Sequence, residues 1–276
     1  MSATEQSDVQ ATNVAPWNTK LVALVTGGVS GIGEATAKAL RARGDRVITV
    51  DLRNADINAD LSTAQGRATL VAQAERLAPD GIDLVVAAAG VSLGIGDVLG
   101  VNFFGAVATL EGLRPLLVKR APAQAIAITS TAAIGEVDDE VMAACRDGNE
   151  EAAKVRARHT TEGDAHSPLE YSSSKRALAY WVRRAAITRD WAGSRVFLNA
   201  VAPGLTLTNM TRPMLSDPAL VDVINASTPR AVSQPGQAED LAEAIVAIAS
   251  LRSGYVVGQV LHVDGGTHAI LQPEIY

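Results

Sequence analysis

Tyr171 and Lys175, in the stretch "YSSSK", have the residue types and the spacing of an acid–base pair. Side chains four residues apart lie on one face of a helix, about one turn apart, so both can reach the same small molecule. A free tyrosine, with a pKa near 10, is a poor base at neutral pH, and a nearby lysine ammonium favours its phenolate. The pair therefore predicts proton transfer by Tyr171, although an ordinary helix start with a half-buried tyrosine and a solvated lysine has the same pattern.

A glycine-rich stretch has the composition of a phosphate-binding turn. In "TGGVSGIG" (26–33), Gly27, Gly31 and Gly33 have the spacing G-x-x-x-G-x-G after an aliphatic run. These positions suit a tight turn, the approach of a pyrophosphate and close packing of a helix on a strand. The helix N-terminus that follows offers N–H groups and partial positive charge to a phosphate. We predict a dinucleotide site here, the alternative being an ordinary glycine-rich turn.

Two acidic residues follow the glycine stretch at positions suited to adenosine. Asp51 comes after Gly33 at the end of the next aliphatic run. A carboxylate there can accept hydrogen bonds from the ribose hydroxyls and would repel a 2′-phosphate, which favours NAD over NADP, although Arg53 is close enough to soften this preference. Asp60 and Leu61 are placed for an adenine contact, but Asp60 is equally well explained as a turn residue.

Short aliphatic runs alternate with longer amphipathic segments. This alternation predicts repeated β-α-β units, and hence a Rossmann-type α/β fold with a doubly wound parallel sheet and ligands at the carboxyl ends of the strands. We expect a mobile leader at 1–19 and one domain at 20–276. The predicted strands are 21–26, 45–51, 82–90, 124–130, 195–204 and 258–266, and the predicted helices end near Arg43 or lie near 65–77, 97–119, 171–191 and 238–251.

Residues 136–168 interrupt this alternation, because a few loop residues would suffice between a strand and the Tyr171 helix. The segment holds nine acidic and four basic residues, so it carries most of the net charge of −6. The stretch "EEAAKVRAR" contains helix-forming residues and pairs such as Glu150–Lys154 at i,i+4. We therefore predict a short helical insertion.

Composition narrows the class of protein. A net charge of −6 disfavours nonspecific binding to nucleic acid or anionic membranes, and no apolar run approaches the roughly 20 residues that span a bilayer. The single cysteine, Cys145, indicates a reducing compartment, and we predict a structural role for it and a cytoplasmic location. The four histidines, His159, His166, His262 and His268, have no metal-ligand spacing, so no metal site is predicted; the first two are expected to be solvated and His262 to be a satisfied sheet residue.

The order of motifs resembles that of the short-chain dehydrogenase/reductase family over residues 20–270. These motifs are "TGGVSGIG", "VNFFG", "TSTAA", "YSSSK" and "NAVAPGLTLT". The resemblance implies catalysis by Tyr171 and Lys175 with Ser130 bound to the substrate oxygen, and with Asn102 holding a water that leads protons from Lys175 to solvent. Asn102 could instead bond locally to the backbone, and Ser130 could cap a turn. The cofactor residues implied are Gly27, Ser30, Gly31, Ile32, Gly33, Asp51, Asp60, Leu61, Ala89, Gly90, Tyr171, Lys175, Pro203, Gly204, Thr206 and Thr208.

The chain departs from the family pattern in two places. Ala87-Ala88-Ala89-Gly90 stands where the family usually has Asn-Asn-Ala-Gly, so the adenosine side must depend on backbone contacts. Ser130 and Tyr171, which a short connection usually separates in the family, have the whole of 136–168 between them. The insertion explains this distance and resembles the bacterial 3α-hydroxysteroid dehydrogenase/carbonyl reductase subgroup, which implies NAD(H) and a secondary alcohol or ketone on an alicyclic, terpenoid or steroid-like skeleton.

Two further expectations concern the substrate and the assembly. Residues 207–236 should form a lid, with Met210, Met214, Leu215 and Val223 as an apolar surface, although the same residues could simply be packing. The insertion could block the pairing through the Tyr helix that is common in the family, so we predict a homodimer through the C-terminal helix and last strand. A noncatalytic dinucleotide-binding sensor or scaffold on the same fold remains the alternative function.

Overall fold

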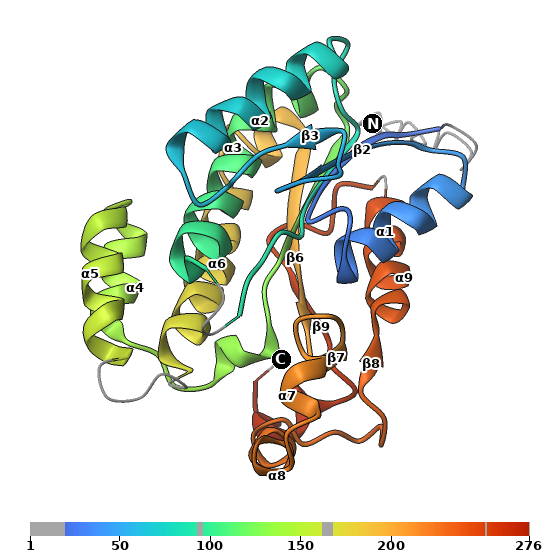
Figure 1. Ribbon diagram of the computed structural model, residues 1–276. Helices are drawn as coiled ribbons and strands as arrows, with labels where there is room; N and C mark the ends of the chain where they lie inside the picture. Colours follow the sequence, from blue (N-terminus) through green and yellow to red (C-terminus); the bar gives the residue numbers. More distant parts are fainter. Residues whose placement is uncertain (1–19, 93–95, 162–167, 252, 276) are drawn as a thin grey trace, which may run out of the picture.

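Seven parallel strands form one sheet in the order β3-β2-β1-β4-β5-β6-β9, which is the predicted doubly wound arrangement. The computed structural model describes residues 20–92, 96–161, 168–251 and 253–275, so the predicted leader at 1–19 lies outside the described residues. Figure 1 shows the sheet between two layers of helices. The strands are β1 (Val22–Thr26), β2 (Arg46–Asp51), β3 (Ile57–Asn58), β4 (Leu84–Ala87), β5 (Ala123–Ile128), β6 (Val196–Pro203) and β9 (Val260–Val263).

The helices divide between the two faces of the sheet (Figure 1). One face is covered by α2 (Ala64–Leu77), α3 (Ala106–Val118) and α6 (Leu169–Ala186), and the other by α1 (Gly31–Ala42) and α9 (Ala238–Ala249). Every residue of β4, β5 and β6 is buried, as expected for parallel strands covered on both sides. Aliphatic side chains make up most of the two resulting cores, one on each face.

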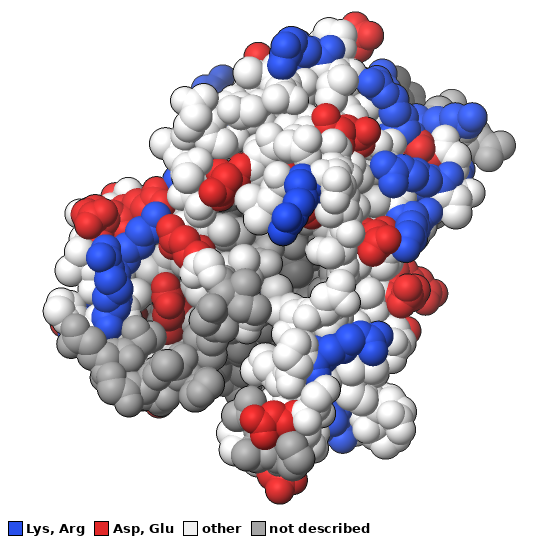
Figure 2. Space-filling model, in the orientation of Figure 1, with Lys and Arg blue, Asp and Glu red and all other residues white. Residues whose placement is uncertain are grey.

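The predicted insertion forms two helices, α4 (Asp139–Arg146) and α5 (Glu150–Thr161), which pack against each other and against α6. Asp138 caps α4 by accepting a hydrogen bond of 2.8 Å from the Val141 N–H. Arg156 of α5 binds the same carboxylate at 2.7 Å. Figure 2 shows basic and acidic side chains lying next to each other over this helical pair, and Arg156 also lies 3.4 Å from Glu140. Part of the acidic charge of the insertion is therefore paired on this face.

The helix that carries Tyr171 ends earlier than the sequence predicts. The apolar pattern suggests a helix to about Trp191, but α6 ends at Ala186. The chain then turns so that the Trp191 side chain packs edge-to-face against Trp181 of α6, with ring centroids 6.0 Å apart, and Trp191 is almost fully buried. A buried tryptophan just beyond a helix prolongs the apparent periodicity, which explains the error.

The helix after β4 differs from expectation in two ways. It begins with a π-helical turn, η1 (Gly100–Gly105), and continues as α3. With 19 residues and a mean hydropathy of 1.2, the combined helix Gly100–Val118 is long and apolar enough to span a membrane by length and composition alone. The prediction that no apolar run approaches this length was therefore wrong here; 56% of the helix is buried within the fold, as for a core helix.

The C-terminal third adds a small substructure at the carboxyl ends of the strands (Figure 1). Strands β7 (Thr206–Leu207) and β8 (Gly236–Gln237) pair with each other and enclose α7 (Arg212–Leu215) and α8 (Pro218–Ser227). The chain continues through α9 and β9 to α10 (Thr267–Leu271). The segment predicted as a lid thus begins and ends in a two-stranded sheet.

Candidate active site

A cleft with a volume of about 380 Å³ opens where β1, β2, β4, β5 and β6 end. The segments that follow these strands bring together residues that are far apart in the sequence. Of the residues predicted for catalysis or cofactor binding, only Asn102 does not line this cleft. The lining residues are Gly27, Ser30, Gly31, Ile32, Gly33, Asp51, Asp60, Leu61, Ala89, Gly90, Ser130, Tyr171, Lys175, Pro203, Gly204, Thr206 and Thr208.

The glycine turn after β1 has the geometry of a phosphate cradle. Gly27 and Gly31 have φ values of +65° and +51°, a region that favours glycine. A Cβ on Gly33 would lie 2.2 Å from the Gly27 carbonyl oxygen, so α1 can approach β1 only because this residue is glycine. Ser30 begins α1 without capping it through its side chain, and the first turn of the helix lines the cleft. Its N–H groups and its dipole therefore suit a pyrophosphate.

Asp51 and Asp60 line the cleft together with the glycine turn, and the Asp51 carboxylate lies 3.4 Å from the Val29 N–H of that turn. Asp51 accepts a hydrogen bond of 2.8 Å from the Leu52 N–H, whereas Arg53 is exposed and is not among the residues lining the cleft. Asp60 accepts hydrogen bonds from the Ser62 N–H at 3.0 Å and the Ser62 hydroxyl at 2.6 Å. The carboxylate of Asp60 thus stabilises its own turn, which was the alternative interpretation, and its adenine contact stays a prediction.

The alanines after β4 leave the backbone close to the glycine turn. The Ala89 N–H donates to the Thr26 hydroxyl at 3.0 Å. A Cβ on Gly27 would lie 3.0 Å from Ala89, so the two segments are in direct contact. This close approach fits a site whose adenosine side is formed by the backbone.

Three of the four predicted catalytic residues meet at the other end of the cleft. Ser130 follows β5 and begins the 3-10 turn η2 (Thr131–Ile134), and Tyr171 lies in the first turn of α6. The insertion leaves the sheet after η2 and returns to α6, so the long separation in sequence closes and Ser130 and Tyr171 both line the cleft. Ser130 lies close enough to Tyr171 to lower the pKa of its hydroxyl. Lys175 lies one turn further along, with Nζ 5.8 Å from the centroid of the Tyr171 ring. The Ser130 hydroxyl also accepts a hydrogen bond of 3.1 Å from the Ala132 N–H, which is the turn cap of the alternative interpretation. The catalytic partnership of Tyr171 with Ser130 stays a prediction.

Burial controls the acid–base properties of this group. Desolvation raises the pKa of the Tyr171 hydroxyl, against the lowering effect of the Ser130 hydrogen bond. Desolvation also lowers the pKa of Lys175 to about 8, and its Nζ donates to the Ile128 carbonyl at 3.0 Å. The sequence suggests that Lys175 lowers the pKa of Tyr171, but in the protein alone the cost of burying a phenolate is larger.

Asn102 lies behind the cleft and is completely buried in η1. Its Oδ1 accepts from the Val91 N–H and its Nδ2 donates to the Val91 carbonyl, both at 2.9 Å. The Nδ2 is also 3.4 Å from the Ser174 hydroxyl. The side chain therefore makes the backbone contacts of the alternative interpretation, and it fixes Val91 beside Gly90; its role in holding a water stays a prediction.

The serines of "YSSSK" do more than begin a helix, which is the role that the sequence suggests. All three are buried. Ser172 donates to the Glu136 carbonyl at 2.7 Å and Ser173 accepts from the Asp138 N–H at 2.9 Å, so both hold the start of the insertion against α6. Polar residues between Tyr171 and Lys175 were a possible signal of such contacts, but their partners lie at the opposite end of the insertion in the sequence.

The segment predicted as a lid contributes less apolar surface than expected. Of the four apolar residues named for it, Met210 lines the cleft, whereas Met214, Leu215 and Val223 do not appear in its lining and Val223 is 63% exposed. The helical spacing of apolar residues in the sequence does not distinguish side chains that face the cleft from side chains that face the solvent. Sequence reasoning missed other lining residues, which are Val50, Leu52, Ala59, Ser62, Ala88, Val91, Gly96, Asp97, Val101, Ile128, Thr129, Asn209 and Thr211.

Cys145 and the described histidines do not line the cleft. His262 stacks on His268 with ring centroids 3.9 Å apart, and its Nδ1 is buried without a hydrogen-bond partner among the described residues, so the prediction of a satisfied sheet histidine was wrong. His166 lies outside the described residues. The described part of the chain contains no metal-binding cluster of His, Cys, Asp and Glu. Cys145 is buried, and desolvation raises its pKa to about 12, as suits a structural thiol.

Known proteins resemble this chain in sequence and in fold. The family model described as short chain dehydrogenase matches residues 21–144, and the one described as enoyl-(acyl carrier protein) reductase matches residues 163–268. The chain is 33% identical to the 3-alpha-hydroxysteroid dehydrogenase/carbonyl reductase of Comamonas testosteroni, covering 91% of this chain and 98% of the relative. It is 30% identical to the cis-4-hydroxycyclohexanecarboxylate dehydrogenase of Sinomonas cyclohexanicum, over 90% and 97%. Among solved structures, the 3-alpha-hydroxysteroid dehydrogenase of Pseudomonas sp. B-0831 complexed with NADH matches with a TM-score of 0.84 and 32% identity, over 92% of this chain and 100% of that one.

Proposed function

The chain belongs to the short-chain dehydrogenase/reductase family, and we propose that it is an NAD-dependent oxidoreductase that interconverts a secondary alcohol and a ketone on an alicyclic, terpenoid or steroid-like skeleton. The observation that carries this proposal is the convergence of Ser130, Tyr171 and Lys175 on the cleft that also contains the glycine turn and Asp51. A site for proton transfer beside a site for a dinucleotide is what a hydride-transfer reaction requires.

The residues of the cleft fit a nicotinamide dinucleotide in order along its length. The glycine turn and the uncapped start of α1 would hold the pyrophosphate, and Asp51 would bind the adenosine ribose. Pro203, Gly204, Thr206 and Thr208, at the end of β6 and just after it, would lie at the nicotinamide end. When bound, the nicotinamide supplies the hydride donor or acceptor.

The protein's own residues would manage the substrate oxygen and its proton. In ketone reduction, Tyr171 would donate its hydroxyl proton to the developing alkoxide, and Ser130 would hydrogen-bond the same oxygen. Lys175 would hold its charge near the phenolate that results. Because burial raises the pKa of Tyr171, the protein alone keeps the protonated form that reduction needs. We therefore expect alcohol oxidation, which needs the base form, to increase with pH more steeply than ketone reduction.

Two observations support the substrate class. The names of the relatives above include a steroid and a substituted cyclohexane, both with ring-borne oxygen. Met210 and Val91 contribute apolar surface to the cleft beside the polar catalytic residues. A mostly apolar pocket with a few convergent polar groups suits a hydrophobic alcohol or ketone.

The decisive experiment is a cofactor-coupled absorbance assay on a panel of cyclic and steroidal alcohols and ketones with the Tyr171→Phe variant. We expect turnover to fall by at least about 10³-fold, since general acid–base catalysis contributes up to roughly 10⁴-fold. Tyr180→Phe is the matched control, because Tyr180 lies on the same helix and is 57% exposed. Turnover of Tyr171→Phe equal to that of the wild type would exclude the catalytic assignment, and NADH binding without turnover of any alcohol or ketone would favour the sensor.

The cofactor preference is tested separately at Asp51. Replacement by alanine removes the carboxylate that would repel a 2′-phosphate, so we expect the ratio of kcat/KM for NAD⁺ over NADP⁺ to fall by roughly tenfold or more. An unchanged ratio would mean that another residue sets the preference.

We also propose a homodimer that uses β9 and α10. The insertion helices α4 and α5 already contact α6, so they occupy surface that a pairing through α6 would use. At the other end of the sheet, β9 is an edge strand, and Leu261, Ile270 and Leu271 are each 45–47% exposed there. A tetramer in light scattering, or a pairing through α6, would contradict this assembly.

A further inference from the structure

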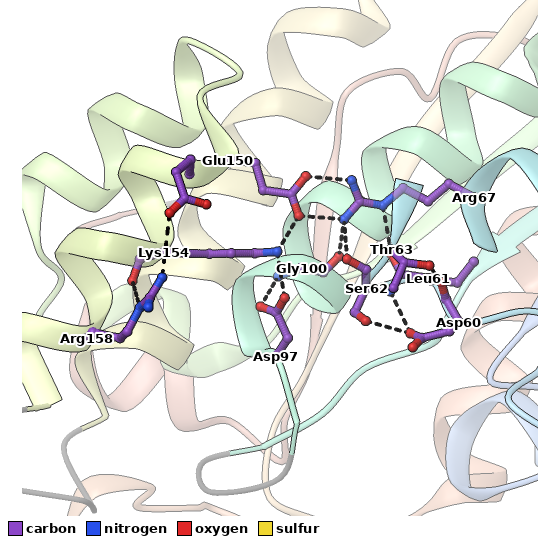
Figure 3. Close-up of polar contacts among 11 residues, drawn as sticks. Asp60, Leu61, Ser62, Thr63, Arg67, Asp97, Gly100, Glu150, Lys154 and Arg158 are labelled. Carbon is purple, nitrogen blue, oxygen red and sulfur yellow. Dashed lines mark hydrogen bonds and ion pairs between the residues drawn. The ribbon is translucent and has the colours of Figure 1, made fainter. Parts of the chain in front are cut away.

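The insertion reaches the dinucleotide cleft through a glutamate on α5. Figure 3 shows Glu150 facing Arg67 of α2, 83 residues away in the sequence. The two side chains form a bidentate pair, with Nη1–Oε2 at 2.7 Å and Nη2–Oε1 at 2.9 Å. This planar arrangement holds the guanidinium in one orientation.

Arg67 uses its remaining donors on backbone carbonyls around the cleft (Figure 3). Its Nε donates to the Leu61 carbonyl at 2.8 Å, and its Nη2 contacts the carbonyls of Ser62 at 3.2 Å and Gly100 at 2.9 Å. Leu61 and Ser62 line the cleft, next to Asp60. One guanidinium therefore joins the turn after β3 to the start of η1.

A second cation, Lys154 of the insertion, extends this network of ion pairs. Lys154, one turn beyond Glu150 on α5, lies 2.6 Å from Glu150 Oε1 and 2.6 Å from Asp97 Oδ2. Asp97 lines the cleft, and its Oδ1 accepts from the Gly100 N–H at 2.7 Å. The insertion is thus tied to both segments that border the cleft on this side.

The turn that Arg67 holds has little freedom to shift as a block. A Cβ on Gly66 would lie 1.9 Å from the Asp60 carbonyl oxygen, and a Cβ on Gly105 would lie 2.9 Å from that of Leu61. The turn therefore rests directly on the backbone of α2 and η1. The hydrogen bonds of Arg67 to the Leu61 and Ser62 carbonyls add to this backbone contact.

The network is sufficiently protected from water to matter energetically. The side chains of Arg67, Lys154 and Glu150 are 14%, 23% and 29% exposed. Burial alone would raise the pKa of Glu150, but hydrogen bonds from Arg67 and Lys154 bring it below its usual value. Ion pairs in such surroundings are screened less than those on the open surface.

We propose that Glu150 is a positioning residue for the adenosine half of the dinucleotide, acting through the orientation of Arg67 and the Leu61–Ser62 turn. This inference rests on the proposed function, since it requires that a dinucleotide bind in the cleft. It also gives the insertion a role beyond spacing Ser130 from Tyr171. Ala87 and Ala88 offer no side-chain hydrogen bonds on the adenosine side. Binding of adenosine therefore depends more on the position of the backbone turn at Leu61 and Ser62.

The test measures binding of ADP-ribose, which contains the adenosine half and lacks nicotinamide, by isothermal titration calorimetry. We expect Glu150→Gln to raise the Kd for ADP-ribose and for NADH by roughly tenfold, the order expected when a charge-assisted contact is lost. The KM for the cofactor should rise much more than kcat falls. Glu151→Gln is the matched control, because Glu151 is the next residue on α5, its side chain is 80% exposed, and its ion pair with Arg158 is long, at 3.8 Å.

A second variant separates positioning from simple stabilisation. Arg67→Lys keeps the charge beside Glu150 but cannot contact the same carbonyls and Glu150 together. It should weaken ADP-ribose binding as much as Glu150→Gln does. The double variant should bind ADP-ribose as tightly as either single variant, because both substitutions act through the same guanidinium. If Glu150→Gln does not fold, Arg67→Lys decides by the same criterion.

The possible outcomes distinguish the two proposals. ADP-ribose binding that is equal in wild type and folded Glu150→Gln would overturn the positioning role, as would an equal loss in Glu151→Gln. Additive losses in the double variant would also overturn it. A wild-type protein that binds neither ADP-ribose nor NADH would instead overturn the proposed function.

Discussion

The buried charge of Lys175 is expected to lower the free energy of unfolding of the protein. Its ammonium is buried, and desolvation lowers its pKa from 10.5 to about 8. Since each pKa unit corresponds to about 1.4 kcal/mol, keeping the lysine charged costs the folded state roughly 3 kcal/mol at pH 7. Replacement by methionine removes this cost but leaves the Ile128 carbonyl without its 3.0 Å hydrogen bond. That loss costs about 1 kcal/mol, so Lys175→Met should be more stable than the wild type by about 2 kcal/mol at pH 7.

The sign of the pH dependence follows from the same pKa. Because the folded pKa of Lys175 lies below the unfolded value, the unfolded chain binds more protons between pH 8 and pH 10.5. The wild type therefore gains stability relative to Lys175→Met as the pH rises through this range. The cost of the charge falls to about 1.5 kcal/mol at pH 9.5, so the advantage of the variant should nearly disappear there.

Urea unfolding of the cofactor-free proteins at pH 7 and pH 9.5 measures this difference. Lys38→Met is the control, because the Lys38 side chain is 69% exposed and its replacement should have little effect at either pH. The reasoning would be refuted if Lys175→Met were less stable than the wild type at pH 7, or if the difference between them were the same at both pH values. Either result would mean that the buried lysine is not under the desolvation cost described here.

Three further predictions concern other parts of the chain. Gly33→Ala places a Cβ 2.2 Å from the Gly27 carbonyl oxygen, so thermal unfolding should show a lower Tm and fluorescence titration a weaker affinity for NADH; normal values of both would contradict the packing of α1 on β1. The Cys145 thiol, with its pKa raised to about 12, should react with a disulfide reagent at pH 8 only after unfolding, and rapid reaction of the native protein would contradict its burial. Asp138→Ala removes the cap of α4 and the partner of Arg156, so urea unfolding should show a loss of about 1–2 kcal/mol at pH 7. Because hydrogen bonds from Arg156 and Val141 outweigh burial and lower the pKa of Asp138, this loss should shrink as the pH falls below about 4, and a loss independent of pH would exclude the ion pair as its cause.

Local patterns were sufficient for the order of the elements and for most of the cleft. The aliphatic runs, the glycine turn and the Tyr171–Lys175 spacing each depend on residues within one or two turns of one another, so their geometry is encoded nearby. The parallel direction of the strands follows from the same alternation, because helical connections of this length return the chain to the end of the sheet where the previous strand began. The family resemblance then assigned Ser130 to Tyr171 across the whole insertion, a pairing that spacing alone could not provide.

Contacts between distant segments were decided only by the tertiary structure. Trp191 continues the apolar periodicity of its helix, yet the chain turns so that the ring packs back onto Trp181. His262 lies in a strand but stacks on His268, and its Nδ1 has no hydrogen-bond partner among the described residues, with Asp264 Oδ2 at 3.9 Å. Arg67 and Glu150 look like two ordinary surface charges, one in a helix and one in the insertion. Their pairing depends on where α5 lies against α2 and η1, and that position is set by the packing of the insertion on α6, which no local pattern specifies.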